Sequence, residues 1–168
     1  MKKLLLILLI IPNLLFCQEQ FSKEGEKYYE IGEKYNQNKD YEKAIINYEK
    51  AANLRYDFAL FAIASYYNDL NKEDKVLEYL NKYIEIGGDY PWAFQMRANI
   101  HKEKERYNIA IDDYLKVIEN DPSGEYVKDP FYSIGFCYIE LENLNKACEY
   151  FTFSTTFEDK DWLTKNCK

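Results

Sequence analysis

This 168-residue chain has little histidine, and its basic residues are outnumbered by acidic ones. The single histidine is His101, and 22 Lys and Arg residues are outnumbered by 29 Asp and Glu, giving a net charge of -7. The sequence holds no metal-spaced His/Cys cluster, no Ser-His-Asp arrangement and no phosphate-cradling glycine loop. An acidic chain also lacks the electrostatic footprint that phosphate backbones require. We therefore expect no enzymatic activity, no metal or cofactor, and no nucleic-acid partner.

Strand-like alternation, linkers and low-complexity segments are missing from residue 21 onward, and a helical pattern runs through almost all of this part. Within it, small-residue anchors recur at intervals of 32, 34 and 37, and a large apolar or aromatic residue follows each anchor four positions later. These anchor pairs are Ala44 and Tyr48, Val76 and Leu80, Ala110 and Tyr114, and Ala147 and Phe151. A period near 34 residues predicts stacked helical hairpins.

A second pattern precedes each anchor, with the +3, +4, +7 spacing of one helix face. The four segments are Tyr28-Ile31-Gly32-Tyr35, Leu60-Ile63-Ala64-Tyr67, Phe94-Arg97-Ala98-His101 and Phe131-Ile134-Gly135-Tyr138. The third residue of each is small because the second helix of the hairpin is expected to cross there. Four tandem copies of this arrangement resemble tetratricopeptide repeats over nearly all of residues 18–168.

The resemblance implies an all-α fold, a right-handed α-solenoid of about four helix-turn-helix repeats. Residues 1–17 are set aside as a secretory signal segment. We expect the repeats at about 25–57, 58–90, 91–124 and 128–158, followed by a short capping helix over 159–168 that such arrays need at their ends.

In this family the first helices of successive hairpins line a concave groove, which the resemblance implies as the binding surface. Aromatic anchors and amide side chains suited to an extended peptide are expected there. The groove residues predicted from the spacing are Tyr29, Glu33, Phe61, Ser65, Asn68, Trp92, Gln95, Asn99, Tyr132 and Phe136. The lysine-and-asparagine clamp that some members use for chaperone carboxyl termini is not reproduced.

Two polar residues occupy positions that are apolar or aromatic in the other repeats. Arg97 replaces isoleucine on an inner helix face, and Asp113 is its predicted partner across the hairpin in a structural ion pair. His101 stands where the other repeats carry tyrosine, and we interpret it as a packed structural histidine.

The N-terminal residues indicate export. Lys2 and Lys3 precede the apolar run of residues 4–11, which is too short to span a bilayer and is typical of a secretory signal. Cys17 stands where a lipoprotein signal carries its lipidated cysteine, but bulky Phe16 before it favours ordinary cleavage after Cys17. Both outcomes stay open, so membrane association is expected only through an anchor at Cys17.

Three cysteines remain after export, and an oxidising compartment permits disulfides between them. Cys148 and Cys167 lie symmetrically about one turn, and Cys137 and Cys148 about another. Cys148 follows the small anchor Ala147 and is expected to face the next helix, which favours a Cys148–Cys167 bond. The Cys137–Cys148 pairing is the alternative.

These features predict a non-catalytic scaffold of the bacterial cell envelope that binds a protein or peptide partner in its groove. The alternative is a structural assembly subunit that uses its convex face or ends and has no groove ligand.

Overall fold

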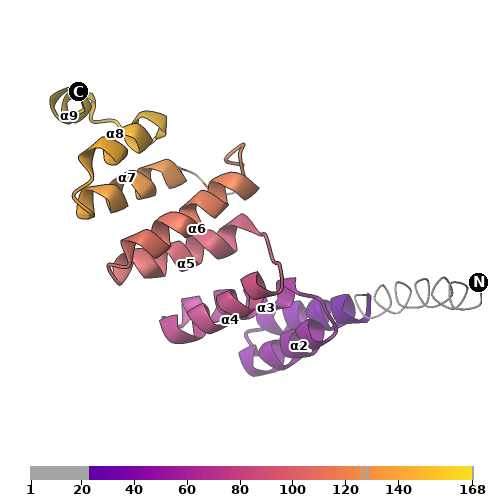
Figure 1. Ribbon diagram of the computed structural model, residues 1–168. Helices are drawn as coiled ribbons and strands as arrows, with labels where there is room; N and C mark the ends of the chain where they lie inside the picture. The colour runs from indigo at the N-terminus through magenta and orange to yellow at the C-terminus, as the bar shows by residue number, and fades with distance from the viewer. Residues whose placement is uncertain (1–22, 126, 128, 168) are drawn as a thin grey trace, which may run out of the picture. The chain divides into compact units, whose positions relative to one another are not determined.

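The computed structural model describes residues 23–125, 127 and 129–167, so the predicted signal segment and its Cys17 lie outside the described residues. Within them, α-helix is the only regular secondary structure apart from turns and bends (Figure 1). The all-α fold of helix-turn-helix repeats, of the α-solenoid class, is therefore confirmed. None of the described helices combines the length and apolar character that a membrane crossing needs.

The chain divides into two compact units between Gly88 and Asp89. Unit 1 contains the helix at residues 23–37, α2 (Tyr41–Asn53), α3 (Phe58–Asp69) and α4 (Glu73–Glu85). Unit 2 contains α5 (Pro91–Glu103), α6 (Tyr107–Asn120), α7 (Pro130–Glu140), α8 (Leu144–Phe153) and α9 (Lys160–Asn166). Consecutive helices pair as hairpins, with α3 on α4, α5 on α6, and α7 on α8.

Side-chain caps and prolines mark where several of these helices begin. Asp40, Asn143 and Asp159 each accept a hydrogen bond from a backbone N–H three residues later, which satisfies one of the free donors of the first turn. Pro91 and Pro130 open α5 and α7, where their missing N–H costs nothing.

The turn inside each hairpin contains one residue in the left-handed conformation. These residues are Lys39, Asn71, Glu105 and Glu142, with φ between 53° and 60°. Their intervals of 32, 34 and 37 repeat those of the small anchors, because each lies five residues before its anchor. The same tight turn therefore sets every hairpin, although none of the four residues is glycine.

The small residues lie where the hairpin helices cross. Gly32 is buried, and a Cβ added there would lie 2.6 Å from the Tyr48 ring. Gly135 has the same relation to Phe151, also at 2.6 Å. Unit 2 also contains a buried hydrophobic cluster, which is made of Ala98, Ala110, Ile111, Tyr114, Ile134 and Cys137. Close packing at these crossings fixes the rotation of each first helix about its axis. It therefore also determines which face of that helix points away from the core.

Candidate functional site

A small pocket in unit 1 gathers residues from helix 23–37 and α3, the first helices of its two hairpins. Its volume is about 190 Å³, and four of the predicted groove residues line it: Tyr29, Glu33, Phe61 and Ser65. Asn68 does not line the pocket, and its side chain is exposed near the end of α3. The structure therefore brings together most of the groove residues predicted in this unit.

Aromatic rings form much of the pocket wall. Tyr48, Phe58 and Tyr66 line it together with Tyr29 and Phe61. The centroid of the Tyr29 ring lies 5.4 Å from that of Tyr48 and 5.9 Å from that of Phe58, and the Phe58 and Phe61 rings are 5.3 Å apart. These spacings are those of favourable tilted and edge-to-face pairs, so the wall is a packed aromatic cluster.

Carboxylates and one amide supply the polar lining of the same pocket. Glu33 accepts a hydrogen bond from the Tyr48 hydroxyl, and Asn36 and Asp69 also line the pocket. Burial, together with this bond to Glu33, raises the pKa of Tyr48. Tyr48 therefore stays protonated and holds the Glu33 carboxylate against the ring cluster.

The sequence reasoning missed Tyr48, Phe58, Tyr66 and Asp69 as pocket residues. A signal was present on α3, since positions 58, 61, 62, 65 and 69 follow the spacing of one helix face. Tyr48 could not be found in this way because it reaches the pocket from the second helix of its hairpin.

In unit 2 the predicted groove residues of α5 form a polar chain. Gln95 Nε2 donates to Asn99 Oδ1 over 3.2 Å, and the Tyr114 hydroxyl donates to the same oxygen over 2.7 Å. Gln95 Oε1 is buried without a hydrogen-bond partner among the described residues. Trp92, at the start of the same helix, keeps 43 % of its surface exposed. The α5 face thus offers an amide pair beside an exposed indole.

The two predicted groove residues on α7 are both large and exposed. Tyr132 packs its ring against Phe151 and Phe157, with centroids 5.9 and 6.3 Å away. Phe136 has the ammonium of Lys102, on α5, 5.9 Å from its ring centroid. The exposed face of α7 therefore carries two aromatic side chains, and Lys102 of α5 lies close to one of them.

The predicted partners Arg97 and Asp113 lie together between α5 and α6. Arg97 Nε donates to Asp113 Oδ2 over 2.8 Å, and Nη2 donates to Oδ1 over 2.6 Å. The Asp113 side chain is almost fully buried, and that of Arg97 is 19 % exposed. This bidentate geometry is the strongest arrangement of an arginine–carboxylate pair, and its place inside the hairpin suits a structural role.

At the C-terminal end, Cys148 of α8 and Cys167 after α9 lie in bonding geometry as a disulfide, with Cα atoms 5.5 Å apart. Cys137 is a free, buried thiol, and burial raises its pKa to about 11. Trp162 of α9 lies edge-on to Phe151 and Phe157, at 5.3 and 5.6 Å between centroids. The short helix therefore covers the aromatic end of the last hairpin.

His101 is buried at the end of α5, and its Nδ1 has no hydrogen-bond partner among the described residues. Burial lowers its pKa, although nearby Asp113 opposes the shift. No group of three or more His, Cys, Asp or Glu side chains in the described part of the chain is placed to hold a metal ion. The burial of His101 agrees with a packing role for this side chain.

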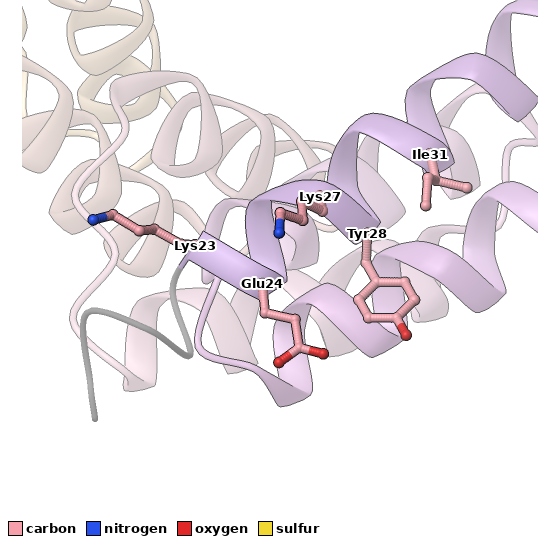
Figure 2. Close-up of a pocket in the computed structure, with 5 residues that line it drawn as sticks. All are labelled: Lys23, Glu24, Lys27, Tyr28 and Ile31. Atoms are coloured by element: carbon pink, nitrogen blue, oxygen red, sulfur yellow. The ribbon is translucent and has the colours of Figure 1, made fainter. Parts of the chain in front are cut away.

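Two larger hollows lie away from the predicted groove residues. One, of about 490 Å³, follows the outer side of helix 23–37, where Figure 2 shows Lys23, Glu24, Lys27, Tyr28 and Ile31 along a single helix. The other, of about 480 Å³, lies in unit 2 beside the loop after α6, with Phe131 and the 61 % exposed Phe153 in its lining. Neither hollow includes a residue predicted for the groove.

Comparison with solved structures shows the fold. The MamA protein superposes with a TM-score of 0.64 at 20% identity, over 80% of this chain and 73% of that one. PilF of Pseudomonas aeruginosa gives 0.60 at 18% identity over 84% and 63%. YrrB, described as a TPR protein with an unusual peptide-binding site, gives 0.59 at 21% identity over 95% and 85%.

Sequence comparisons agree with this fold. A curated relative, DnaJ protein P58IPK homolog B of Oryza sativa subsp. japonica, is 30% identical over 99 residues, 59% of this chain. The matched part covers only 21% of that relative's length. The family profile described as tetratricopeptide repeat matches residues 27–58, 93–123 and 129–152, just over half of the chain. The chain belongs to the tetratricopeptide repeat family.

Proposed function

We propose that the protein is a non-catalytic scaffold of the bacterial cell envelope that binds a protein or peptide through the first-helix faces of its hairpins. The observation that carries this proposal is the unit 1 pocket, where Tyr29, Glu33, Phe61 and Ser65 converge from two first helices. Aromatic anchors around a partly enclosed pocket are the side chains that dominate binding energy in protein interfaces.

The corresponding faces of unit 2 support the same role. Trp92 and Tyr132 are each 43 % exposed and Phe136 is 39 % exposed, all on first helices. Exposed aromatic residues next to an amide pair suit an extended peptide, because the rings supply contact area and the amides pair with peptide groups. The likeness to YrrB, whose description names a peptide-binding site, adds to this support.

Export is part of the proposal and rests on two features. The apolar segment after Lys2 and Lys3 has the pattern of a secretory signal. The Cys148–Cys167 geometry suits an oxidising compartment, where a disulfide would tie α9 to α8. Non-reducing mass spectrometry of the protein isolated from the envelope should find this pair linked and Cys137 free. Three free thiols, or a Cys137–Cys148 link, would contradict the proposed Cys148–Cys167 disulfide.

Photo-crosslinking tests groove binding directly. A photoreactive phenylalanine at Trp92, on the first-helix face, should crosslink one discrete partner in the native envelope. The same residue at Leu115, on α6 and 39 % exposed, is the matched control and should not. Trp92→Glu should abolish capture by a crosslinker at Tyr132, which lies in the same unit and is also 43 % exposed, and leave thermal stability nearly unchanged, whereas Leu115→Glu should preserve capture.

A structural assembly subunit is the second candidate, and the hollow beside Phe153 favours it. Phe153 keeps 61 % of its surface exposed beside a hollow that Ile118 and Phe131 line together with polar residues, and a partner that covered this hollow would bury the Phe153 ring. Partner capture that survives Trp92→Glu and fails on Phe153→Glu would select this function over the groove.

A further inference from the structure

We propose that the unit 1 pocket binds the cationic side chain of a lysine or arginine in the partner. The inference rests on the proposed function and names the chemistry of the partner at this one position.

The pocket is suited to a cation because aromatic side chains make up much of its lining. Tyr29, Tyr48 and Phe61 are among the rings that line it. The face of an aromatic ring carries negative potential and attracts an ammonium or guanidinium group within about 6 Å of its centroid. This protein already uses such contacts elsewhere in unit 1, where Lys50 lies 5.4 Å from the Tyr28 ring centroid and Lys43 lies 5.4 Å from that of Tyr35.

The charge of the lining agrees with this choice. Glu33 and Asp69 both line the pocket, and no Lys or Arg is among the described residues that do. Tyr48 donates its hydroxyl hydrogen to Glu33 and so fixes one carboxylate beside the rings. An arriving cation would meet aromatic faces and two negative groups, whereas a carboxylate would be repelled.

Pocket size limits the occupant to one side chain. Pockets for whole small molecules measure about 300–1,000 Å³, and this one measures about 190 Å³. A long, unbranched side chain with a charge at its end matches a small pocket that has apolar walls and a carboxylate. The peptide backbone would then lie outside the pocket, on the first-helix face.

Unit 2 provides an internal contrast at the equivalent positions. The tyrosine hydroxyl there meets the neutral Asn99 in place of a carboxylate. On α7, Phe136 has the chain's own Lys102 close to its ring. Unit 2 thus lacks the fixed negative charge and supplies its own cation, which restricts the proposed site to unit 1.

The test is an NMR titration of the purified full chain with three small probes. They are the Nα-acetyl methylamides of lysine, arginine and norleucine, the last having the lysine stem without its charge. Amide shifts of Ser65 and of residue 33 report binding at the pocket. Glu33→Gln removes the carboxylate and keeps an oxygen for Tyr48. Glu49→Gln is the matched control, since Glu49 accepts from the Tyr79 hydroxyl over 3.1 Å but does not line the pocket.

We expect the lysine or arginine probe to bind about tenfold more tightly than the norleucine probe. Glu33→Gln should remove most of this preference, and Glu49→Gln should leave it intact. Asp69→Asn, at an exposed helix end where folding is not at risk, should weaken binding in the same direction.

Equal binding of all three probes, absence of binding, or full lysine preference in both Glu33→Gln and Asp69→Asn would overturn the inference. These outcomes are distinguishable from failure of the scaffold function, because crosslinking through position 92 does not depend on Glu33. Retained crosslinking with no probe preference would leave the scaffold standing and remove only the cation site.

Discussion

The first hairpins of unit 1 and unit 2 make the same tyrosine hydrogen bond to different acceptors. In each, the tyrosine four residues after the small anchor donates its hydroxyl hydrogen to the first helix. Tyr48 donates to the carboxylate of Glu33, and Tyr114 donates to the amide oxygen of Asn99. One hairpin geometry therefore supports either a charged or a neutral face, so the chemistry of the binding surface can change without a change of fold.

The two hairpins differ in a second respect, inside the crossing of their helices. Unit 2 pairs Arg97 with Asp113, whereas the equivalent positions of unit 1 are Ile31 and Asn47. Asn47 is buried and donates from Nδ2 to the Lys43 carbonyl over 2.7 Å, within its own helix. Unit 1 thus satisfies its polar residue locally, while unit 2 depends on a partner from the other helix.

Breaking the Arg97–Asp113 pair should cause the largest loss of stability. Asp113→Ala leaves the mostly buried Arg97 guanidinium without this carboxylate, and we expect a loss of about 3–5 kcal/mol in the free energy of unfolding. Urea denaturation followed by circular dichroism measures it.

The control transfers the unit 1 residues into unit 2. The double variant Arg97→Ile, Asp113→Asn should recover most of the lost stability, because it removes both charges and keeps a side chain that can bond within α6. A double variant as unstable as Asp113→Ala would show that the two hairpins are not interchangeable at this crossing.

A change at Gly32, which packs against the Tyr48 ring where the two helices cross, should cause the next largest loss of stability. Unit 2 carries Ala98 at the equivalent position, so a Cβ is accommodated beside Tyr114 but would meet the Tyr48 ring at 2.6 Å. Gly32→Ala should therefore cost about 1–3 kcal/mol through overpacking and weaken the bond to Glu33. Ala98→Gly serves as the comparison, with an expected cost of about 1 kcal/mol from helix entropy and a further loss from the missing contacts of its fully buried methyl group. A Gly32→Ala variant with unchanged or increased stability would contradict a closer approach in unit 1.

Acid should weaken unit 2 through His101, a position that carries tyrosine in unit 1. Burial lowers the pKa of His101 in the folded protein, so folding favours the neutral imidazole. Its contribution to stability is complete above the ordinary pKa near 6.5 and declines as the pH falls below it. His101→Tyr, the residue of the other repeats, should flatten the stability profile between pH 7 and 5. An unchanged profile would assign the acid sensitivity to other groups.

The repeat period predicted the fold because burial at the crossings demands small residues at fixed spacing, and Gly32, Ala98 and Gly135 meet that demand. It also placed Tyr29 and Phe61 on one surface, since both lie on first helices. It could not find the pocket's Tyr48, which is buried and lines the pocket from the second helix of its hairpin. Side-chain direction across a helix contact depends on local packing, which spacing along the chain does not encode.

The sequence indicated where hairpin turns lie, for example at residues 36–39 and 71–73, but not their shared backbone conformation. Helix ends usually signal a left-handed residue with glycine, but this chain places lysine, asparagine and glutamate there. Only the structure shows that these residues share one conformation at the intervals of the anchors. The residue type at these positions does not predict their left-handed conformation, because the surrounding hairpin imposes it on whichever residue occupies the turn.

Glycine at these turns should give the smallest effect, and a stabilising one. Lys39 in unit 1 and Glu105 in unit 2 have φ of 60° and 57°, a conformation that strains any residue with a Cβ. Relief of this strain exceeds the extra chain entropy of glycine, so Lys39→Gly and Glu105→Gly should each add about 0.5–1 kcal/mol. Asp112→Gly, on the exposed side of α6, is the control and should cost about 1 kcal/mol. Equal gains in both units would mean that one turn geometry serves the charged and the neutral hairpin alike, whereas a loss at either site would show that its lysine or glutamate makes a contact worth more than the strain.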